Sequence, residues 1–271
     1  MIDRICISIN NRCNLRCSYC HFREKKTSVS AAMDVYAILR NVLDYVRHPF
    51  KIGFVGNGEP LLDYGALCGY IDFVSSSPLI STYTITNGTV GLSQDQWRFF
   101  EERGVNVGFS VDGPRDVHEQ GRPGSFDAAI ANAELYKQAI GRYPTFNATV
   151  GARSLGERER VVSFFEQFDT RVTFSRMIGL QGISLDDYRD FLAYAESRIP
   201  VRRGGLDCTM YGGSCGAGKN NYYFANGFVY YCGNCVDMAP LGGSDTSFFD
   251  LEASSLCFDR SKCWKEFAAC E

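Results

Sequence analysis

Several features that would place this chain in other protein classes are missing from its sequence. It has no run of about 18 apolar residues, which excludes a transmembrane helix. The net charge is only −3, so nothing indicates a nucleic acid or a membrane surface as a partner. Asp3 and Arg4 lie inside an expected strand, so no signal peptide is predicted. We therefore expect a cytoplasmic protein.

Cysteine, in contrast, is abundant. The 271 residues include 12 cysteines, which without export fit metal binding in a reducing compartment better than disulfides. Cys13, Cys17 and Cys20 lie close together near the start of the chain. Three thiolates on one short loop can bind three irons of a [4Fe–4S] cube and leave the fourth iron open to a small molecule. The alternative is a disulfide loop or a zinc knuckle with His21 as the fourth ligand.

Strand and helix patterns alternate over residues 1–203, which predicts parallel βα units with right-handed crossovers. The strand patterns cover residues 5–10, 51–55, 82–85, 105–109, 145–150 and 171–175. The helical patterns cover residues 31–47, 94–102, 125–141 and 157–168. We predict an α/β protein in which residues 1–203 form a partial (β/α)6 barrel like that of triosephosphate isomerase. Residues 204–271 are predicted to form a small cysteine-rich domain with a β-hairpin.

Each unusual motif directly follows one of the predicted strands. The cysteine triplet follows the first strand, Gly56 to Pro60 follows the second, Asn87 follows the third, and Ser110 to Pro114 follows the fourth. The carboxyl ends of parallel strands meet at one face, and βα barrels place their chemistry there. We therefore expect these motifs to meet on one rim of the barrel.

The Cys-x3-Cys-x2-Cys spacing, with Tyr19 before the last cysteine, resembles the radical S-adenosylmethionine (SAM) enzymes. The sequence Gly-Asn-Gly-Glu-Pro at 56–60 is similar to the Gly-Gly-Glu-Pro motif of that family, with Asn57 as the departure. In the family, SAM binds the open iron and is cleaved reductively to a 5′-deoxyadenosyl radical. The resemblance implies that SAM is bound by Tyr19, Gly56, Asn57, Gly58, Glu59, Asn87, Ser110, Asp112 and Arg122.

The stretch from Ser110 to Phe126 resembles one subgroup, the anaerobic sulfatase-maturating enzymes and the peptide maturases with a SPASM or twitch auxiliary domain. In that subgroup a serine and an arginine hold the SAM carboxylate, and the matching positions here are Ser110 and Arg122. An arginine suits this role because its planar fork can pair with a carboxylate at two places. The alternative for Arg122 is a solvated loop arginine.

Seven of the twelve cysteines lie after residue 207. The spacing Cys215-x11-Gly227-x4-Cys232 matches the opening of SPASM and twitch domains, and Asn226-Gly227 predicts a hairpin over residues 221–231. The later spacing departs from the SPASM pattern, and a zinc-bound tail is the alternative. The resemblance implies one or two auxiliary [4Fe–4S] clusters, with ligands among Cys208, Cys215, Cys232, Cys235, Cys257, Cys263 and Cys270. Cys6 and Cys68 are expected to be small core residues.

Three substrate classes agree with this resemblance. The first is a ribosomally made peptide that is crosslinked or epimerised. The second is a small molecule such as an aminoglycoside, which is epimerised or dehydrogenated. The third, a sulfatase converted to its formylglycine form, is disfavoured because Gly233 stands where that group has an aspartate. An epimerase needs a hydrogen-atom donor, for which Cys235 is the candidate.

The expected partners are the substrate and an electron donor of the flavodoxin or ferredoxin type. A separate leader-peptide-binding protein is a further candidate, because the chain has no spare segment for such a domain. A non-enzymatic iron–sulfur or zinc scaffold would need the cysteines alone. It would not need Ser110, Arg122 and a glycine-rich loop on the same rim.

Overall fold

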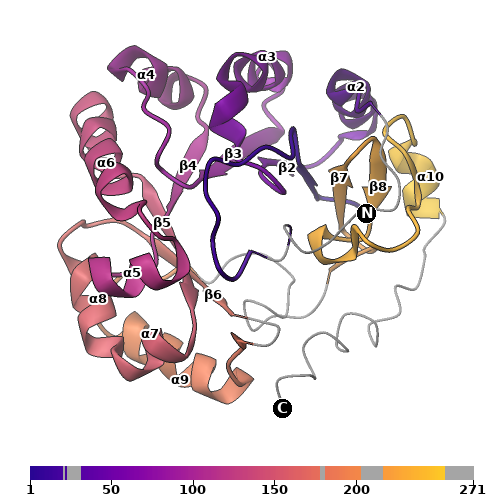
Figure 1. The fold of residues 1–271 in the computed structure, drawn as a ribbon. Coiled ribbons are helices and arrows are strands. Elements are labelled where there is room, and N and C mark those ends of the chain that lie inside the picture. The colour runs from indigo at the N-terminus through magenta and orange to yellow at the C-terminus, as the bar shows by residue number, and fades with distance from the viewer. Residues whose placement is uncertain (21, 23–31, 178–180, 203–215, 254–271) are drawn as a thin grey trace.

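The sheet of this protein is continuous and curved, and its helices lie on the outer side (Figure 1). The computed structural model describes residues 1–20, 22, 32–177, 181–202 and 216–253. Within these residues the strands pair in the order β6-β5-β4-β3-β2-β1-β7-β8-β9, and β1 to β6 are parallel. Parallel strands in consecutive order with helices between them form the predicted partial (β/α)6 barrel.

The predicted strands and the four predicted helices are present, most of them with shifted ends. The strands are β1 (Arg4–Ile7), β2 (Phe50–Phe54), β3 (Ile80–Thr86), β4 (Asn106–Ser110), β5 (Thr145–Val150), β6 (Val172–Arg176), β7 (Asn221–Ala225), β8 (Phe228–Tyr230) and β9 (Gly242–Gly243). The helices are α2 (Val35–Tyr45), η1 (Pro60–Asp63), α3 (Tyr64–Val74), α4 (Gln94–Glu102), α5 (Arg115–Gly121), α6 (Phe126–Ile140), α7 (Ala152–Gly156), α8 (Arg158–Glu166), α9 (Leu185–Glu196), η4 (Gly233–Cys235) and α10 (Phe248–Ala253). None of these described helices is long and apolar enough to cross a membrane.

The first strand ends earlier than the sequence pattern predicts. The prediction extends it to Asn10, but β1 stops at Ile7. The Asn10 side chain accepts a hydrogen bond from the backbone N–H of Arg12 (3.0 Å) and donates to Asp63 (2.8 Å). An asparagine that bonds to the backbone two residues on turns the chain, so the strand gives way to the cysteine loop.

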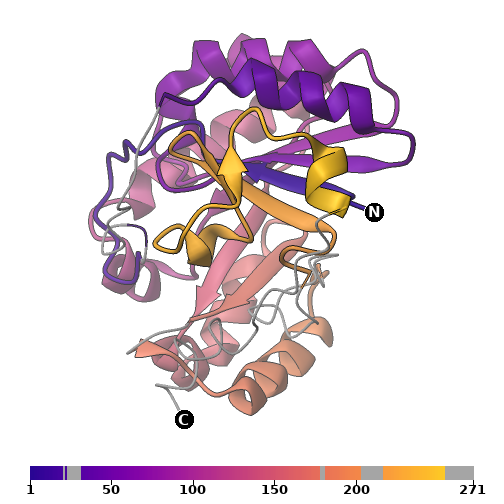
Figure 2. The same ribbon diagram turned by 90° about the vertical axis from the view of Figure 1, so that its right-hand side faces the viewer.

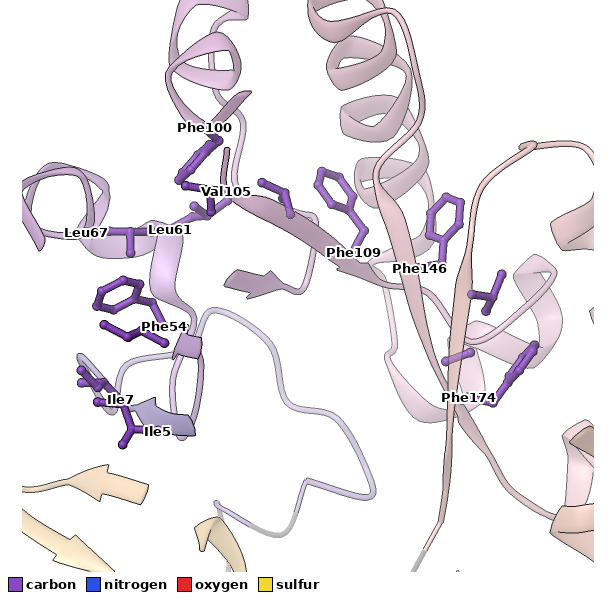
Figure 3. Packing of buried hydrophobic residues seen from close by; sticks show 14 of the residues in the cluster. Ile5, Ile7, Phe54, Leu61, Leu67, Phe100, Val105, Phe109, Phe146 and Phe174 are labelled. Carbon is purple, nitrogen blue, oxygen red and sulfur yellow. The ribbon is translucent and has the colours of Figure 1, made fainter. Parts of the chain in front are cut away.

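The core lies between the outer face of the sheet and the helices. Ile5, Ile7 and Phe54 point to this side and are fully buried (Figure 3). Helix α2 covers them with an apolar stripe that includes Leu39, and its N-terminus is capped by the side chain of Asp34. Burial of one such side chain contributes about 1.5–3 kcal/mol, so this layer holds the barrel rim in place.

Side chains alternate between the two faces of a strand, and on β4, β5 and β6 the inner face carries polar side chains. Its polar residues line a cavity and include Ser110, Asn147, Thr149, Thr173 and Ser175. At Gly53, a β-carbon would lie 2.4 Å from the ring of Tyr83, so glycine makes room for an inward-pointing tyrosine. The barrel thus has a dry outer layer and an inner cavity that is lined by both polar and apolar side chains, among them Val55 and Ile85.

The predicted hairpin extends the barrel sheet. Strand β7 pairs in parallel with β1, and β8 folds back antiparallel to β7 (Figure 2). The turn has positive φ at both Asn226 (55°) and Gly227 (86°), as a two-residue hairpin of the favoured type requires. The hairpin therefore lies directly beside the strand that leads into the cysteine loop. The domain boundary at residue 204 stays a prediction.

Candidate functional site

The three clustered cysteines lie on the loop that follows β1. Cys13, Cys17 and Cys20 all line a cavity of about 320 Å³, together with residues that follow β2, β3 and β4. Among the described residues, no three Cys, His, Asp or Glu side chains are grouped so as to hold one metal ion. In a [4Fe–4S] cluster with three cysteine ligands, each thiolate binds a different iron. The three sulfurs therefore need to surround one cavity and do not need to converge on a single metal ion. The arrangement fits a cluster.

Backbone contacts hold this loop against its neighbours. The N–H of Glu59 donates to the carbonyl of Arg12 (2.7 Å), and the N–H of Ser18 donates to the carbonyl of Gly121 (2.9 Å). A β-carbon at Gly58 would lie 2.5 Å from the same Arg12 carbonyl. The second glycine of the Gly-Asn-Gly-Glu-Pro motif therefore allows the two loops to touch.

Glu59 is buried and holds the end of β3. Its carboxylate accepts hydrogen bonds from the backbone N–H of Leu61 (3.0 Å), the Thr86 hydroxyl (2.7 Å) and the backbone N–H of Asn87 (2.7 Å). Burial raises the pKa of Glu59, and these donors oppose the rise. Because both oxygens are engaged by the protein, Glu59 positions the loop, and a direct contact with a cofactor stays a prediction.

Two polar side chains approach the cysteine sulfurs. The amide nitrogen of Asn87 lies 3.9 Å from Cys13 Sγ, and Nη1 of Arg122 lies 3.8 Å from Cys17 Sγ. Burial raises the pKa of Cys17, and the Arg122 guanidinium acts against this. A cation beside a sulfur favours the thiolate that iron requires. Arg122 thus places a positive charge beside the sulfur of Cys17.

Arg122 is held by a buried ion pair rather than by solvent. Its Nε donates to Asp112 (3.2 Å), and its guanidinium lies 5.4 Å from the centre of the Tyr19 ring. Asp112 also accepts from the Tyr19 hydroxyl (2.5 Å) and from the Thr149 N–H (2.8 Å). The interpretation of Arg122 as a solvated loop residue is therefore wrong, because its side chain is only 13% exposed.

The buried His118 on α5 supports this arrangement. Its Nδ1 accepts from the Asp112 N–H (3.2 Å), and its Nε2 lies 2.8 Å from the Ser125 hydroxyl. That hydroxyl donates to the carbonyl of Arg122 (2.6 Å), so His118 Nε2 carries a proton and donates. Burial lowers the pKa of His118, which keeps the ring neutral. The only sequence signal for this role is its place within the Ser110–Phe126 stretch.

The predicted cofactor contacts divide between two cavities. Gly56, Asn57, Gly58, Glu59, Asn87, Ser110 and Arg122 line the cavity of the cysteines. Tyr19 and Asp112 line a second cavity of about 460 Å³, whose other walls include Gly151 and Met177. Thr149 lines both. The structure therefore brings all the predicted contacts to the rim, on two sides of the Tyr19–Asp112–Arg122 group.

The tail contributes one pair of cysteines to the described structure. Cys232 directly precedes the short helix η4, and Cys235 is the last residue of that helix. The two sulfurs lie 3.4 Å apart. Cys235 is buried, whereas Cys6 on β1 is half-buried and lies 3.3 Å from the Tyr83 hydroxyl. The other predicted auxiliary-cluster ligands, Cys208, Cys215, Cys257, Cys263 and Cys270, lie outside the described residues. The same holds for His21, the alternative zinc ligand.

Comparison with known proteins identifies the family. Residues 7–165 match the family described as the Radical SAM superfamily, which is more than half of the chain. The chain belongs to the radical SAM superfamily. The expected resemblance is thereby confirmed. A [4Fe–4S] cluster and SAM are the cofactors of this family, and the three cysteines that share one cavity fit the cluster.

This radical SAM protein is related to the sulfatase-maturating enzymes. The cysteine-type anaerobic sulfatase-maturating enzyme of Clostridium novyi (strain NT) is 25% identical over 179 residues, or 60% of this chain and 47% of the relative. The chain spans about half the length of curated relatives that it matches.

Two solved structures share the fold. Native anSMEcpe with bound AdoMet and Cp18Cys peptide has a TM-score of 0.74 at 20% identity, over 98% of this chain and 88% of that one. Streptococcus suis SuiB bound to its precursor peptide SuiA has a TM-score of 0.74 at 16% identity, over 97% of this chain and 69% of that one. These likenesses establish the radical SAM fold for this chain.

Proposed function

We propose that this protein cleaves SAM reductively and modifies a ribosomally made peptide by abstracting hydrogen from a C–H bond. The main support for this proposal is that Cys13, Cys17 and Cys20 share one cavity with Ser110 and Arg122. When bound and reduced, the cluster and SAM together supply the 5′-deoxyadenosyl radical that abstracts the hydrogen. A metal scaffold would have no use for this combination.

The chain's own residues bind and orient the reactants. Cys13, Cys17 and Cys20 would hold the cluster. Arg122 would pair with the SAM carboxylate, aided by Ser110, while its ion pair fixes the direction of the guanidinium. Tyr19 and Asp112, which line the second cavity, would also help to hold SAM. Asp112 acts there as a positioning residue, because its oxygens are already occupied by protein donors.

A peptide substrate is favoured by polar side chains on one wall of the barrel cavity. Asn147, Thr173 and Ser175 line the cysteine cavity. Their amide and hydroxyl groups can satisfy the N–H and C=O groups of a peptide backbone, which a buried peptide needs. SuiB and anSMEcpe, which share this fold, are described as bound to peptides. An aminoglycoside or similar small molecule is the second candidate, because the same polar wall also suits hydroxyl and amino groups.

We assign Cys232 and Cys235 to an auxiliary cluster, with further ligands among the tail cysteines. The short distance between their sulfurs (3.4 Å) supports a shared ligand role. The buried position of Cys235 favours a ligand over the alternative role of hydrogen-atom donor to a substrate. The proposed partners are a flavodoxin or ferredoxin, which would donate electrons, and a separate protein that would bind the leader peptide.

The first test is anaerobic formation of 5′-deoxyadenosine from SAM with a chemical reductant. Cys17→Ala is expected to abolish it, because a cube that lacks one ligand is lost. Cys68→Ala, a matched cysteine variant on α3, is expected to retain it. Unimpaired formation in Cys17→Ala would sink the assignment.

The second test counts auxiliary irons in a variant with alanine at positions 13, 17 and 20. About eight irons would indicate two auxiliary cubes and about four would indicate one, at four irons per cube. Turnover in deuterated water then separates the outcomes for a peptide. Deuterium at an α-carbon indicates epimerisation, and loss of a hydrogen pair indicates crosslinking or dehydrogenation.

A further inference from the structure

The departure from the family motif at Asn57 has a structural partner far along the chain. Where the Gly-Gly-Glu-Pro motif has a glycine, the Asn57 side chain accepts a hydrogen bond from the Tyr223 hydroxyl (2.8 Å) and donates one to Asn11 (3.0 Å). The backbone N–H of Asn57 donates to the Ser8 hydroxyl (2.9 Å). A glycine could make only the last of these bonds. Asn57 therefore joins the loop after β2 to both the cysteine loop and the hairpin.

The hairpin closes this network from its own side. The amide of Asn11 donates to the side chain of Asn226 in the hairpin turn (2.5 Å). Asn11 lies two residues before Cys13, and Tyr223 and Asn226 come from the same hairpin. Three hydrogen bonds among four side chains thus link the loop after β2, the cysteine loop and the hairpin. Such a connected set of bonds holds the cysteine loop against the hairpin more firmly than one contact would.

Tyr223 also lies between the two groups of predicted cluster ligands. Its ring stacks on Phe22, two residues after Cys20, with 6.3 Å between the ring centres and 11° between the planes. On the tail side, a β-carbon at Gly233 would lie 3.3 Å from the Tyr223 ring. Gly233 directly follows Cys232, so the ring packs against the turn that carries this cysteine pair.

The approach of Tyr223 requires a glycine at position 56. A β-carbon there would lie 2.5 Å from the Tyr223 hydroxyl, and Gly56 has φ of 139°, which disfavours other residues. The first glycine of the motif and the asparagine after it therefore both accommodate the same phenol. Burial raises the pKa of Tyr223, so its hydroxyl keeps the proton that it donates. Tyr223 also lines the cysteine cavity.

We propose that Asn57 and Tyr223 are positioning residues that lock the SAM-facing loop and the cysteine loop to the tail hairpin. The hairpin thereby sets the geometry of SAM at the catalytic cluster and the position of Cys232 and Cys235 relative to it. This inference rests on the proposed function of the cavity. It assigns to the side chain at position 57 a role that a glycine could not fill.

The test compares Tyr223→Phe with Tyr222→Phe in the cluster-loaded protein. Both changes remove one phenol hydroxyl from β7. Tyr222 lies on the opposite face of the strand, where its hydroxyl bonds to the carbonyls of Gly218 (3.0 Å) and Leu251 (3.2 Å). Tyr222→Phe is the control for loss of a buried hydroxyl as such. The measurements are iron content, the SAM dissociation constant and the electron paramagnetic resonance spectrum of the reduced cluster with SAM.

Tyr223→Phe is expected to keep the iron content and to change the electron paramagnetic resonance spectrum. SAM binding should weaken about fivefold, which is in the range of one lost hydrogen bond. Asn57→Gly should do the same and also removes the bond to Asn11. The double variant should be about as impaired as Asn57→Gly alone, because the bond that Tyr223→Phe removes is already lost there. Tyr222→Phe should leave SAM binding and the spectrum unchanged. If Tyr223→Phe and Tyr222→Phe match in all three measurements, the proposal is overturned.

Failure of the proposed function has a different signature. A wild-type protein that binds SAM but forms no 5′-deoxyadenosine would contradict the proposed function. The positioning role would still be tested in that case, by comparing the spectra of the wild type and Tyr223→Phe with SAM bound. A wild type that cleaves SAM, with a Tyr223→Phe spectrum identical to its own, would contradict the positioning role alone.

Discussion

The ion pair between Asp112 and Arg122 allows a quantitative test of the site. Their side chains are only 4% and 13% exposed. Removal of one partner of a buried pair costs about 3–5 kcal/mol, because the other charge is left without compensation. In Arg122→Ala, Asp112 keeps the Tyr19 hydroxyl and the Thr149 N–H as donors. We therefore expect the free energy of unfolding to fall by about 3 kcal/mol, at the lower end of this range.

Asp112→Asn combined with Arg122→Ala separates stability from binding. The double variant has no buried charge to compensate, so most of the free energy of unfolding should return. SAM binding should not return, because the guanidinium that pairs with the SAM carboxylate is still absent. A charged hydrogen bond contributes about 1.5–3 kcal/mol, so we expect binding weaker by roughly ten- to hundredfold in both variants.

The assays are anaerobic urea unfolding of the cluster-loaded protein and equilibrium dialysis of SAM. Arg115→Ala is the matched control, because it breaks an Arg–Asp pair with Asp127 whose side chains are 57% and 77% exposed. An exposed pair contributes about 0–1 kcal/mol. The reasoning is refuted if Arg122→Ala costs no more than Arg115→Ala, or if the double variant regains SAM affinity.

Three further outcomes are expected. Glu59→Gln should lower the free energy of unfolding by about 1–3 kcal/mol in urea titrations, because the new amide nitrogen cannot accept from the Asn87 N–H, and an unchanged midpoint would contradict this. Burial lowers the pKa of His118 in the folded state, so the unfolded chain binds the proton more readily. Stability should thus be complete above about pH 6.5 and fall as the pH drops through the lower folded-state pKa, a loss that His118→Gln should reduce. Cys232→Ala should lower the iron content measured after anaerobic reconstitution while 5′-deoxyadenosine formation continues, and unchanged iron would remove Cys232 from the ligand set.

Local patterns were sufficient for much of the fold. The alternation of strands and helices predicts the βα order, and Asn226-Gly227 predicts the hairpin because that pair adopts positive φ readily. Helix α3, which carries Cys68, contains Gly65 and Gly69, two residues of low helical propensity. A β-carbon at Gly69 would lie 2.8 Å from the Tyr36 hydroxyl, so this glycine serves a contact with α2 that the local sequence cannot reveal.

The sequence by itself determined the chemistry of the site, because cysteine spacing and motif position depend on residues a few places apart. Only the tertiary structure decided how the site is held. It brings the Tyr223 hydroxyl into hydrogen-bond contact with Asn57, which lies 166 positions earlier in the sequence. It also buries the Asp112–Arg122 ion pair beside Cys17. The pairing of β7 with β1 depends on which sheet edge is free and in which register the strands meet. Those are properties of the assembled sheet, and no single segment encodes them.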